Sequence, residues 1–322
     1  MERKSLEMNR RRFITTMAAA GAYIPLSHLD GSEMFSFQQP SDRKIHIFTK
    51  PLAWMNYDEM AALVAESGAE GIDLPVRPGG HVLPENVETD LPKAFKAAAK
   101  NGLKMDMIVT GIISADEKYT ETILKTASSL GIKYYRLGWV GYNESLGIMG
   151  TLQKYKGELK KLEALNRKYK IHGAYQNHSG TRIGGPVWDL YELLKDLDPE
   201  YIGCQYDVRH AVVEGGVSWV NGFKLVMPWV KCTDIKDFSW QKINDKWGPV
   251  TVPLGEGMVN FDDYFKLVKS NNVPGPMSLH LEYPPFEKFT EKVTDAEKKK
   301  LFVAAMKKDV DALKAMRTKY QL

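Results

Sequence analysis

Apolar and polar positions along the chain form a repeating order of two patterns. Short β-prone runs alternate with longer stretches in which apolar residues recur three and four positions apart, the spacing of a helix with one buried face. The runs predict strands at residues 45–48, 71–76, 104–109, 133–138, 171–177, 202–207, 229–234 and 277–283. The periodic stretches predict helices at residues 57–67, 91–101, 117–130, 149–169, 187–196, 218–227, 261–270 and 294–320. The pattern therefore predicts eight βα units.

Eight such units without a Ser/Gly-rich linker or a break in composition favour an α/β fold, a single (β/α)8 TIM barrel. A doubly wound open sheet is the alternative. That fold is expected to carry a Gly-rich phosphate turn after its first strand, and residues 48–53 read Phe-Thr-Lys-Pro-Leu-Ala instead. One irregular insertion, residues 237–258, is rich in Trp, Gly and Pro, and we expect it to be a lid or a loop beside the substrate.

The N-terminus has the pattern of an export signal. Arg10 and Arg11 precede a short Ala-rich run, and no charged side chain occurs between Arg12 and His28. This is typical of a twin-arginine leader, so we expect residues 1–35 to be a leader and residues 36–322 to be the barrel domain. The mature protein would then be periplasmic and would have no stable membrane insertion. An N-terminal amphipathic helix is the alternative.

Charge and composition narrow the class of protein only slightly. The 322 residues include 44 basic and 40 acidic side chains, and part of the net charge of +4 comes from the leader. This near balance does not indicate a nucleic-acid partner. An apolar fraction of 43% is ample for a packed core. Both cysteines, Cys204 and Cys232, fall in predicted strands, and we expect them to be buried free thiols.

Four consecutive predicted strands end in polar residues that can bind metal. In a barrel these ends meet at the active-site face, and residues i and i+2 of a strand share one side. The pairs that share a side are Gln176 with His178, Gln205 with Asp207, Asp234 with Lys236, and His280 with Glu282. Their oxygens would suit a divalent ion such as Mg²⁺ or Mn²⁺, or Co²⁺ or Zn²⁺ if a histidine joins. The alternative is that salt bridges satisfy these groups, with the partners Arg136, Arg182, Arg209 or Lys236.

These strand ends also carry a family resemblance. Asn177-His178, Asp207 with His210, Lys236-Asp237 and Glu282 are similar to the motifs of the xylose isomerase-like TIM barrels, the superfamily of sugar (phosphate) isomerases/epimerases and endonuclease IV. The resemblance spans residues 42–320. It implies one divalent ion, Mg, Mn or Co with Zn less expected. The implied ligands are Gln176, Asp207, Asp234 and Glu282.

The chain departs from that family at two ligand positions. Gln176 stands where the family has a glutamate, and Asp234 stands where it has a histidine. The family's two glutamates act as bases on opposite faces of the substrate, which an amide cannot do. The segment 73–82 resembles a substrate-side loop of the family, with Arg77 and His81 as its polar side chains.

The resemblance implies a metal-dependent sugar isomerase or epimerase that removes a proton next to a carbonyl group. We expect Glu282 to be the base, and His178, His210 or Lys236 to handle the second proton. The expected substrate-binding residues are Arg77, His81, Arg136, Trp139 and His280. Because Gln176 removes the second base, a lyase that cleaves 3-keto-glycosides by elimination is a close alternative.

Two other functions fit the sequence less directly. A non-catalytic barrel could bind carbohydrate through Trp139, Trp240 and Trp247 as stacking surfaces. Cleavage of DNA would call for a basic face, which the charge balance does not indicate. We therefore expect a small-molecule carbohydrate partner and no nucleic acid. The identity of the sugar and the oligomeric state stay open.

Overall fold

The computed structural model describes residues 43–287 and 293–322, which belong to one compact unit. The expected leader, residues 1–35, lies outside the described residues. None of the helices in the described ranges is long and apolar enough to cross a lipid bilayer.

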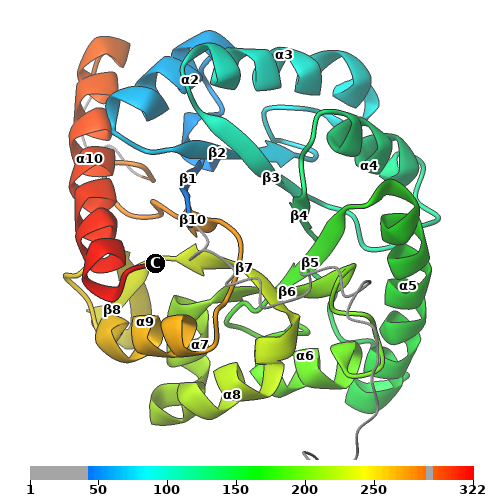
Figure 1. The fold of residues 1–322 in the computed structure, drawn as a ribbon. Helices are drawn as coiled ribbons and strands as arrows, with labels where there is room; N and C mark the ends of the chain where they lie inside the picture. Colours follow the sequence, from blue (N-terminus) through cyan, green and yellow to red (C-terminus); the bar gives the residue numbers. More distant parts are fainter. Residues whose placement is uncertain (1–42, 288–292) are drawn as a thin grey trace, which may run out of the picture. The chain divides into compact units, whose positions relative to one another are not determined.

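Eight parallel strands close into a barrel, which confirms the expected fold (Figure 1). Around the barrel the order is β1, β10, β7, β6, β5, β4, β3 and β2. The strands are β1 (Ile45–Phe48), β2 (Gly71–Val76), β3 (Lys104–Thr110), β4 (Tyr134–Arg136), β5 (His172–Gln176), β6 (Ile202–Asp207), β7 (Val230–Ile235) and β10 (Met277–Leu279). Each coincides with a predicted strand, although β4 and β10 are shorter than expected.

A ring of helices covers the outside of the barrel (Figure 1). They are α2 (Tyr57–Glu66), α3 (Val87–Lys100), α4 (Thr120–Ser129), α5 (Gly147–Tyr169), α6 (Val187–Leu194), α7 (Val208–Gly215), α8 (Trp219–Val226), α9 (Phe261–Ser270) and α10 (Asp295–Tyr320), with 3-10 turns η2 (Lys50–Leu52), η3 (Pro84–Asn86), η4 (Gly216–Ser218) and η5 (Met227–Trp229). Helix α10 buries Phe302, Met306, Val310 and Leu313. These residues are spaced four, four and three apart, so one stripe of the helix packs against the core.

Among the α-helices of the described residues, α7 is the one that the sequence pattern did not predict. It begins directly after β6, because the last strand residue, Asp207, is also the helix N-cap: its side chain accepts a hydrogen bond from the His210 amide at 3.1 Å. No turn residues separate the two elements, and such residues are the usual sign of a boundary. The direct strand-to-helix connection fixes Asp207 at the mouth of the barrel.

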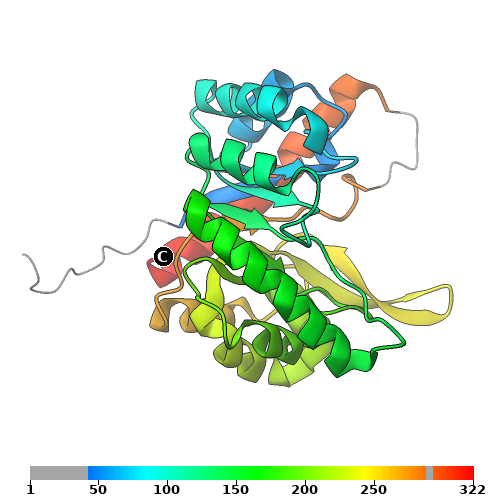
Figure 2. The ribbon, with the colours of Figure 1, turned by 90° about the vertical axis from the view of Figure 1, so that its right-hand side faces the viewer.

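The insertion after β7 forms an antiparallel hairpin, β8 (Asp237–Ile243) and β9 (Lys246–Val252), rather than an irregular loop. Asn244 and Asp245 have positive φ angles and make the two-residue turn. In Figure 2 the hairpin projects beyond the barrel on the same side as the loop before α5.

The buried carboxylate of Asp237 holds the base of this hairpin. It accepts hydrogen bonds from the backbone amides of Phe238, Gly255, Gly257 and Val259 at 2.8 to 3.1 Å. A side chain at Gly257 would collide with this carboxylate, because a Cβ atom there would lie 2.2 Å from Asp237 Oδ1. The Asp237 of the sequence motif is therefore a structural residue.

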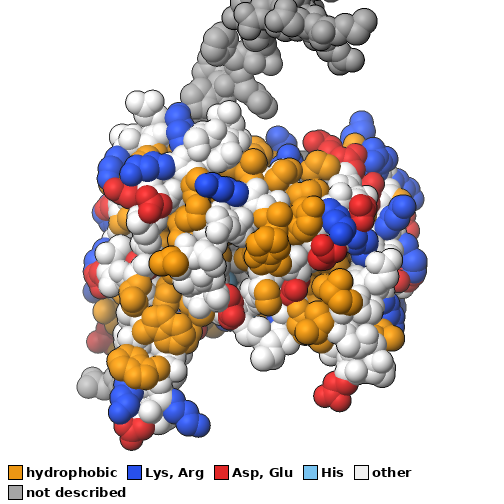
Figure 3. All heavy atoms as spheres, turned by 90° about the horizontal axis from the view of Figure 1, so that it is seen from below, with side chains coloured by type: hydrophobic (Ala, Val, Ile, Leu, Met, Phe, Trp, Pro, Cys, Tyr) orange, Lys and Arg blue, Asp and Glu red, His pale blue; other side chains and the backbone are white. Residues whose placement is uncertain are grey.

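The surface seen from below mixes apolar, basic and acidic side chains in small patches (Figure 3). Among the exposed apolar side chains of the described residues are Trp188 on α6 and the hairpin residues Trp240 and Trp247. Both cysteines are buried and free, as expected.

Candidate active site

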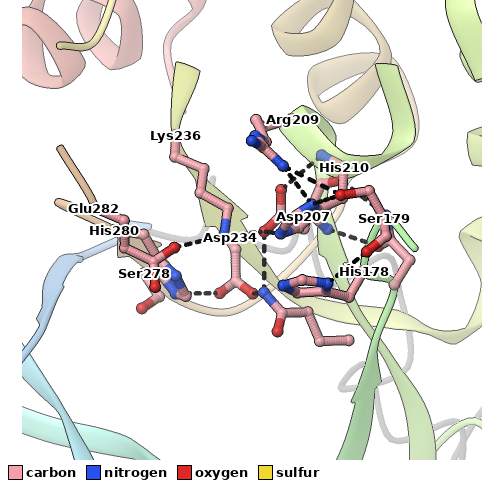
Figure 4. Close-up of polar contacts among 12 residues, drawn as sticks. His178, Ser179, Asp207, Arg209, His210, Asp234, Lys236, Ser278, His280 and Glu282 are labelled. Atoms are coloured by element: carbon pink, nitrogen blue, oxygen red, sulfur yellow. Dashed lines mark hydrogen bonds and ion pairs between the residues drawn. The ribbon is translucent and has the colours of Figure 1, made fainter. Parts of the chain in front are cut away.

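The polar strand ends converge in the barrel lumen, as their spacing predicted. Asp207 of β6 is the register partner of Asp234 of β7, and Gln176 of β5 is the partner of Gln205 of β6. Figure 4 shows Asp207, Lys236 and Glu282 directed toward one another.

Lys236 is the cation at the centre of this group. Its Nζ atom lies 3.1 Å from Asp207 Oδ2 and 3.0 Å from Glu282 Oε2. Burial alone would lower the pKa of Lys236, but the carboxylates of Asp207, Glu282 and Asp234 outweigh it and raise the pKa. Lys236 is therefore an ammonium ion at neutral pH.

Glu282 stays ionised because positively charged groups surround its carboxylate. Burial would raise its pKa, yet the positive charge of Lys236, followed by His280 and Lys50, holds it well below the ordinary value. Lys50 Nζ lies 3.3 Å from the other carboxylate oxygen of Glu282. The carboxylate is bound on both oxygens but is still partly open to solvent.

Gln176 is held in one orientation by its neighbours. Arg136 Nη1 donates to Gln176 Oε1 at 2.8 Å, so the amide nitrogen points the other way. That nitrogen donates to Asp207 Oδ2 at 2.9 Å and to Asp234 Oδ2 at 2.6 Å. A flipped amide would place its NH₂ group against a guanidinium group, which only donates. Gln176 therefore faces the carboxylates as a donor.

Asp234 joins a second group of buried residues deeper in the lumen. Gln205 Nε2 donates to Asp234 Oδ1 at 2.6 Å, and His280 Nε2 lies 3.2 Å from the same oxygen. Asp73 of β2 accepts a hydrogen bond from Ser278 Oγ at 2.6 Å. Asp73, Asp234 and His280 together form a possible metal site, with potential ligand atoms within 4.8 Å of one another.

Sequence reasoning missed part of this second group. Asp73 was assigned only to the start of a substrate loop, and Ser278 was not singled out. The alternation rule could have found Ser278, which shares a strand face with His280 and Glu282. Asp73 had a weaker signal: a lone carboxylate within an apolar strand, which is costly unless it is paired.

The two histidines His178 and His210 have defined tautomers. Arg209 Nη1 lies 2.9 Å from His210 Nδ1 and can only donate, so the proton of His210 is on Nε2, which faces Asp207 Oδ2 at 3.6 Å. His178 Nδ1 lies 2.9 Å from the carbonyl oxygen of Ser179, which can only accept, so the unprotonated nitrogen of His178 is Nε2. Burial lowers the pKa of His178 to about 4 and lowers that of His210 well below its ordinary value.

A cavity of about 430 Å³ opens beside these groups. It is lined by His178, His210, Lys236 and Glu282, and by Val250 and Thr251 of the hairpin strand β9. This volume is in the range of small-ligand pockets. All four residues expected to carry the chemistry therefore line one cavity, with the insertion forming its wall.

The five expected substrate-binding residues lie in different surroundings. Arg136 contacts the rings of Trp139 and Phe48, and Trp139 packs on His178 with ring centroids 4.5 Å apart. Arg77 lies over Phe48 at 6.0 Å. His81 is used in the fold, because its Nε2 lies 2.9 Å from the Thr49 carbonyl oxygen. His280 is buried and stacks on Phe48 instead of lining the cavity.

The four expected metal ligands lie close together, but three of them, Gln176, Asp207 and Glu282, are arranged for other contacts. The carboxylates of Asp207 and Glu282 share the ammonium of Lys236, and Gln176 presents its NH₂ group to both aspartates. An ion among these four would have to displace Lys236 and turn Gln176 against Arg136. For Asp207 and Glu282 the salt-bridge alternative therefore applies, with Lys236 as their partner. Binding of a metal ion by the four expected ligands stays a prediction.

Comparison with known proteins places this geometry in a family. The inosose dehydratase of Mesomycoplasma hyopneumoniae (strain 7448) is 25% identical over 150 residues, 42% of this chain and 49% of the relative. The chain thus spans about half the length of the curated relatives it matches.

Solved structures share the fold at lower identity. The probable 3-DHS dehydratase AsbF from Bacillus anthracis superposes with a TM-score of 0.61 at 18% identity, covering 82% of this chain and 97% of that one. A xylose isomerase-like TIM barrel protein from Mycobacterium smegmatis, solved with magnesium, gives a TM-score of 0.59 at 15% identity, covering 85% and 99%. The family model for the xylose isomerase-like TIM barrel matches residues 61–301. With the closed barrel and the converging strand ends, this match shows that the chain belongs to the xylose isomerase-like TIM barrel family.

Proposed function

We propose that this protein is a lyase that acts on a keto-sugar and eliminates a group from the carbon next to the one that loses a proton. Its similarity to an inosose dehydratase and its fold likeness to a probable 3-DHS dehydratase support a reaction of this class. The lyase expected from the sequence as the alternative is thereby preferred to the epimerase. A 3-keto-glycoside is the proposed substrate.

The orientation of Gln176 carries this proposal. An epimerase with two bases needs a proton acceptor on each face of the reacting carbon. Here Gln176 occupies one of the two positions as an amide whose oxygen is bound by Arg136 and whose nitrogen is bound by two aspartates. Glu282 is then the carboxylate that lines the cavity beside Lys236, and elimination requires one base and one proton donor.

The Lys236–Glu282 pair can supply both. In the proposed reaction, the carboxylate of Glu282 takes the proton from C2, next to the C3 carbonyl group. The electron pair of the C2–H bond forms the C1=C2 double bond as the bond from C1 to the glycosidic oxygen breaks. Lys236 gives a proton to the departing oxygen, and the proton on Glu282 then passes to Lys236 across their 3.0 Å contact. Both residues end in their starting states.

The charges around the site favour proton removal by Glu282 over proton removal by a histidine. The ammonium groups of Lys236 and Lys50 stand next to the base and stabilise the negative charge that develops on the C3 oxygen. His178 is neutral and has its free nitrogen available, which makes it the replacement base to consider if Glu282 is not required. A bound divalent ion would supply further positive charge to the enolate.

Release of a coloured leaving group tests the proposal. A 4-nitrophenyl 3-keto-glucoside should yield 4-nitrophenolate together with a conjugated enone when it is incubated with the native protein. Epimerisation would change the sugar without releasing the phenol. Conversion of the sugar with the phenol still attached would therefore contradict the proposed elimination.

A further inference from the structure

A second group of titratable residues lies one layer deeper in the barrel than the proposed acid and base. Asp234 precedes Lys236 by two residues and His280 precedes Glu282 by two, so each pair shares a strand side and the first member lies further from the mouth. Asp73 reaches the same place from β2. All three side chains are at least 98% buried.

The carboxylates of Asp73 and Asp234 differ from those above them in having no lysine or arginine in contact; the nearest titratable nitrogen to Asp234 is His280 Nε2, 3.2 Å from Oδ1. Asp207 and Glu282 both contact Lys236. Within the described residues, no Lys or Arg nitrogen lies within 4.0 Å of the Asp73 or Asp234 carboxylate, and Arg136 acts on Asp73 only at longer range. Two buried carboxylates that share a single imidazole as their nearest cationic group are costly to a fold.

Several polar atoms of this group also lack hydrogen bonds. Asp73 Oδ1, His280 Nδ1 and His280 Nε2 are buried and have no hydrogen-bond partner among the residues that the structure describes. His280 is held in place by stacking on Phe48, with ring centroids 4.5 Å apart. Buried polar atoms in native proteins usually have a partner, so these three call for one.

We propose that Asp73, Asp234 and His280 form a divalent-cation site in the barrel lumen, which shares only Asp234 with the four ligands expected from the family resemblance. Their potential ligand atoms lie within 4.8 Å of one another. Ligand atoms of a tetrahedral ion at ~2.1 Å lie ~3.4 Å apart, so side-chain shifts of about 1 Å close the site. An ion there partners the free oxygen and the imidazole and offsets the two carboxylates.

The donor set favours a particular class of ion. Two carboxylate oxygens and one imidazole nitrogen suit Zn²⁺, Co²⁺ or Mn²⁺ better than Mg²⁺, which prefers oxygen ligands alone. Ser278 Oγ, bound to Asp73, is the adjacent hydroxyl group that holds this carboxylate in position. The inference is independent of the proposed elimination, because it concerns binding and not turnover.

Calorimetric titration of the metal-stripped protein with ZnCl₂ and MnCl₂ tests the site. The native chain should bind one equivalent, and Asp73→Asn and His280→Gln should each weaken binding by at least about 10–100-fold, a loss already typical of changes beside the ligands themselves. Glu282→Gln is the matched control, because it removes a ligand of the family-type site and leaves this group intact. It should bind with native affinity.

Thermal unfolding with and without the ion gives a second readout, which does not depend on the heat of binding that calorimetry measures. The ion should raise the unfolding midpoint of the native protein and of Glu282→Gln, and at the same concentration should raise those of Asp73→Asn and His280→Gln by less. The melting curves also show whether each variant is folded. Absence of binding in the native protein, native affinity in Asp73→Asn or His280→Gln, or loss of binding in Glu282→Gln would each overturn the assignment.

Discussion

The Nζ atom of Lys236 lies 3.0 Å from Oε2 of Glu282 at the mouth of the barrel, where the family resemblance implies a metal ion bound to that glutamate. The same ammonium lies 3.1 Å from Asp207, the second implied ligand. One side chain thus joins two carboxylates from β6 and from the segment after β10. This contact links the proposed base, Glu282, to the proposed proton donor, Lys236. Lys236 does not contact the deeper carboxylate of Asp73, for which we propose a bound cation.

Replacement of the proposed base should abolish most of the turnover. Glu282→Gln keeps the shape of the side chain but cannot accept the proton, so we expect kcat on a 3-keto-glucoside to fall by about 10²–10⁴, the usual contribution of general acid–base catalysis. KM should change little. Glu256→Gln is the control, since Glu256 is exposed and pairs with Lys308 on α10. Native kcat in Glu282→Gln would transfer the role of base to His178, whose Nε2 carries no proton.

Lys236 should also be important for stability, because it is buried between two carboxylates. Lys236→Met leaves the buried Asp207 carboxylate without its cation, which should lower the free energy of unfolding by about 3–5 kcal/mol. Lys50→Met removes the other contact of Glu282, but Lys50 is exposed, so the expected loss is about 0–1 kcal/mol. Urea unfolding of both variants measures the difference. Equal losses would show that Lys236 has no special electrostatic role.

Asp309 of α10 should make stability depend on pH. Burial raises the pKa of Asp309 to about 6. The hydrogen bonds that Tyr283 Oη and the Leu254 amide donate to this carboxylate lower the pKa, but by less than burial raises it. A folded pKa above the unfolded value of 3.8 means that the contribution of this group is fully present below pH 3.8 and is lost as the pH rises through 6. About two pKa units correspond to roughly 3 kcal/mol.

The matched variants for this pH effect are Asp309→Asn and Asp311→Asn. The unfolding free energy of the native protein relative to Asp309→Asn should increase as the pH is lowered from 7 to 4. Asp311 is an exposed neighbour paired with Lys307, and its variant should follow the native profile. A constant difference between the native protein and Asp309→Asn across this range would refute the assignment.

We propose that the leader directs export through the twin-arginine route. Arg10→Lys combined with Arg11→Lys should leave the full chain in the cytoplasm, because paired arginines define such signals. Arg12→Lys is the control, since it changes the next basic residue and keeps the pair. Cell fractionation gives the readout, and unchanged fractionation of the double variant would reject the proposal.

The sequence predicted the barrel because each strand and nearly every helix has its own local signal. Eight hydrophobic runs with regular spacing define the topology, and alternation within strands correctly placed Gln176, Asp207 and Asp234 in one lumen. The hairpin was expected only as a loop, although the turn residues Asn244 and Asp245 between two β-prone runs were a usable signal. Helix α7 had no separate boundary signal, since Asp207 ends the strand and caps the helix.

The contacts within the site could not be predicted in the same way. Which of several carboxylates the ammonium of Lys236 contacts depends on the stagger of strands around the closed barrel, and spacing along one strand does not report it. The orientation of the Gln176 amide depends on Arg136, which comes from a different strand. Asp73 joins His280 across β1, over a separation of more than 200 residues that no local pattern records.

The nature of the reaction is tested most directly by following a 3-keto-glucoside by proton NMR in deuterium oxide, with native protein and with Glu282→Gln. Elimination predicts that native protein releases the aglycone and forms the C1=C2 enone, without a deuterated epimer of the intact glycoside, and that Glu282→Gln does so about 10²–10⁴ times more slowly. An intact glycoside that is inverted and deuterated at the carbon next to the carbonyl group, with no aglycone released, would contradict the assignment of a one-base lyase to this barrel.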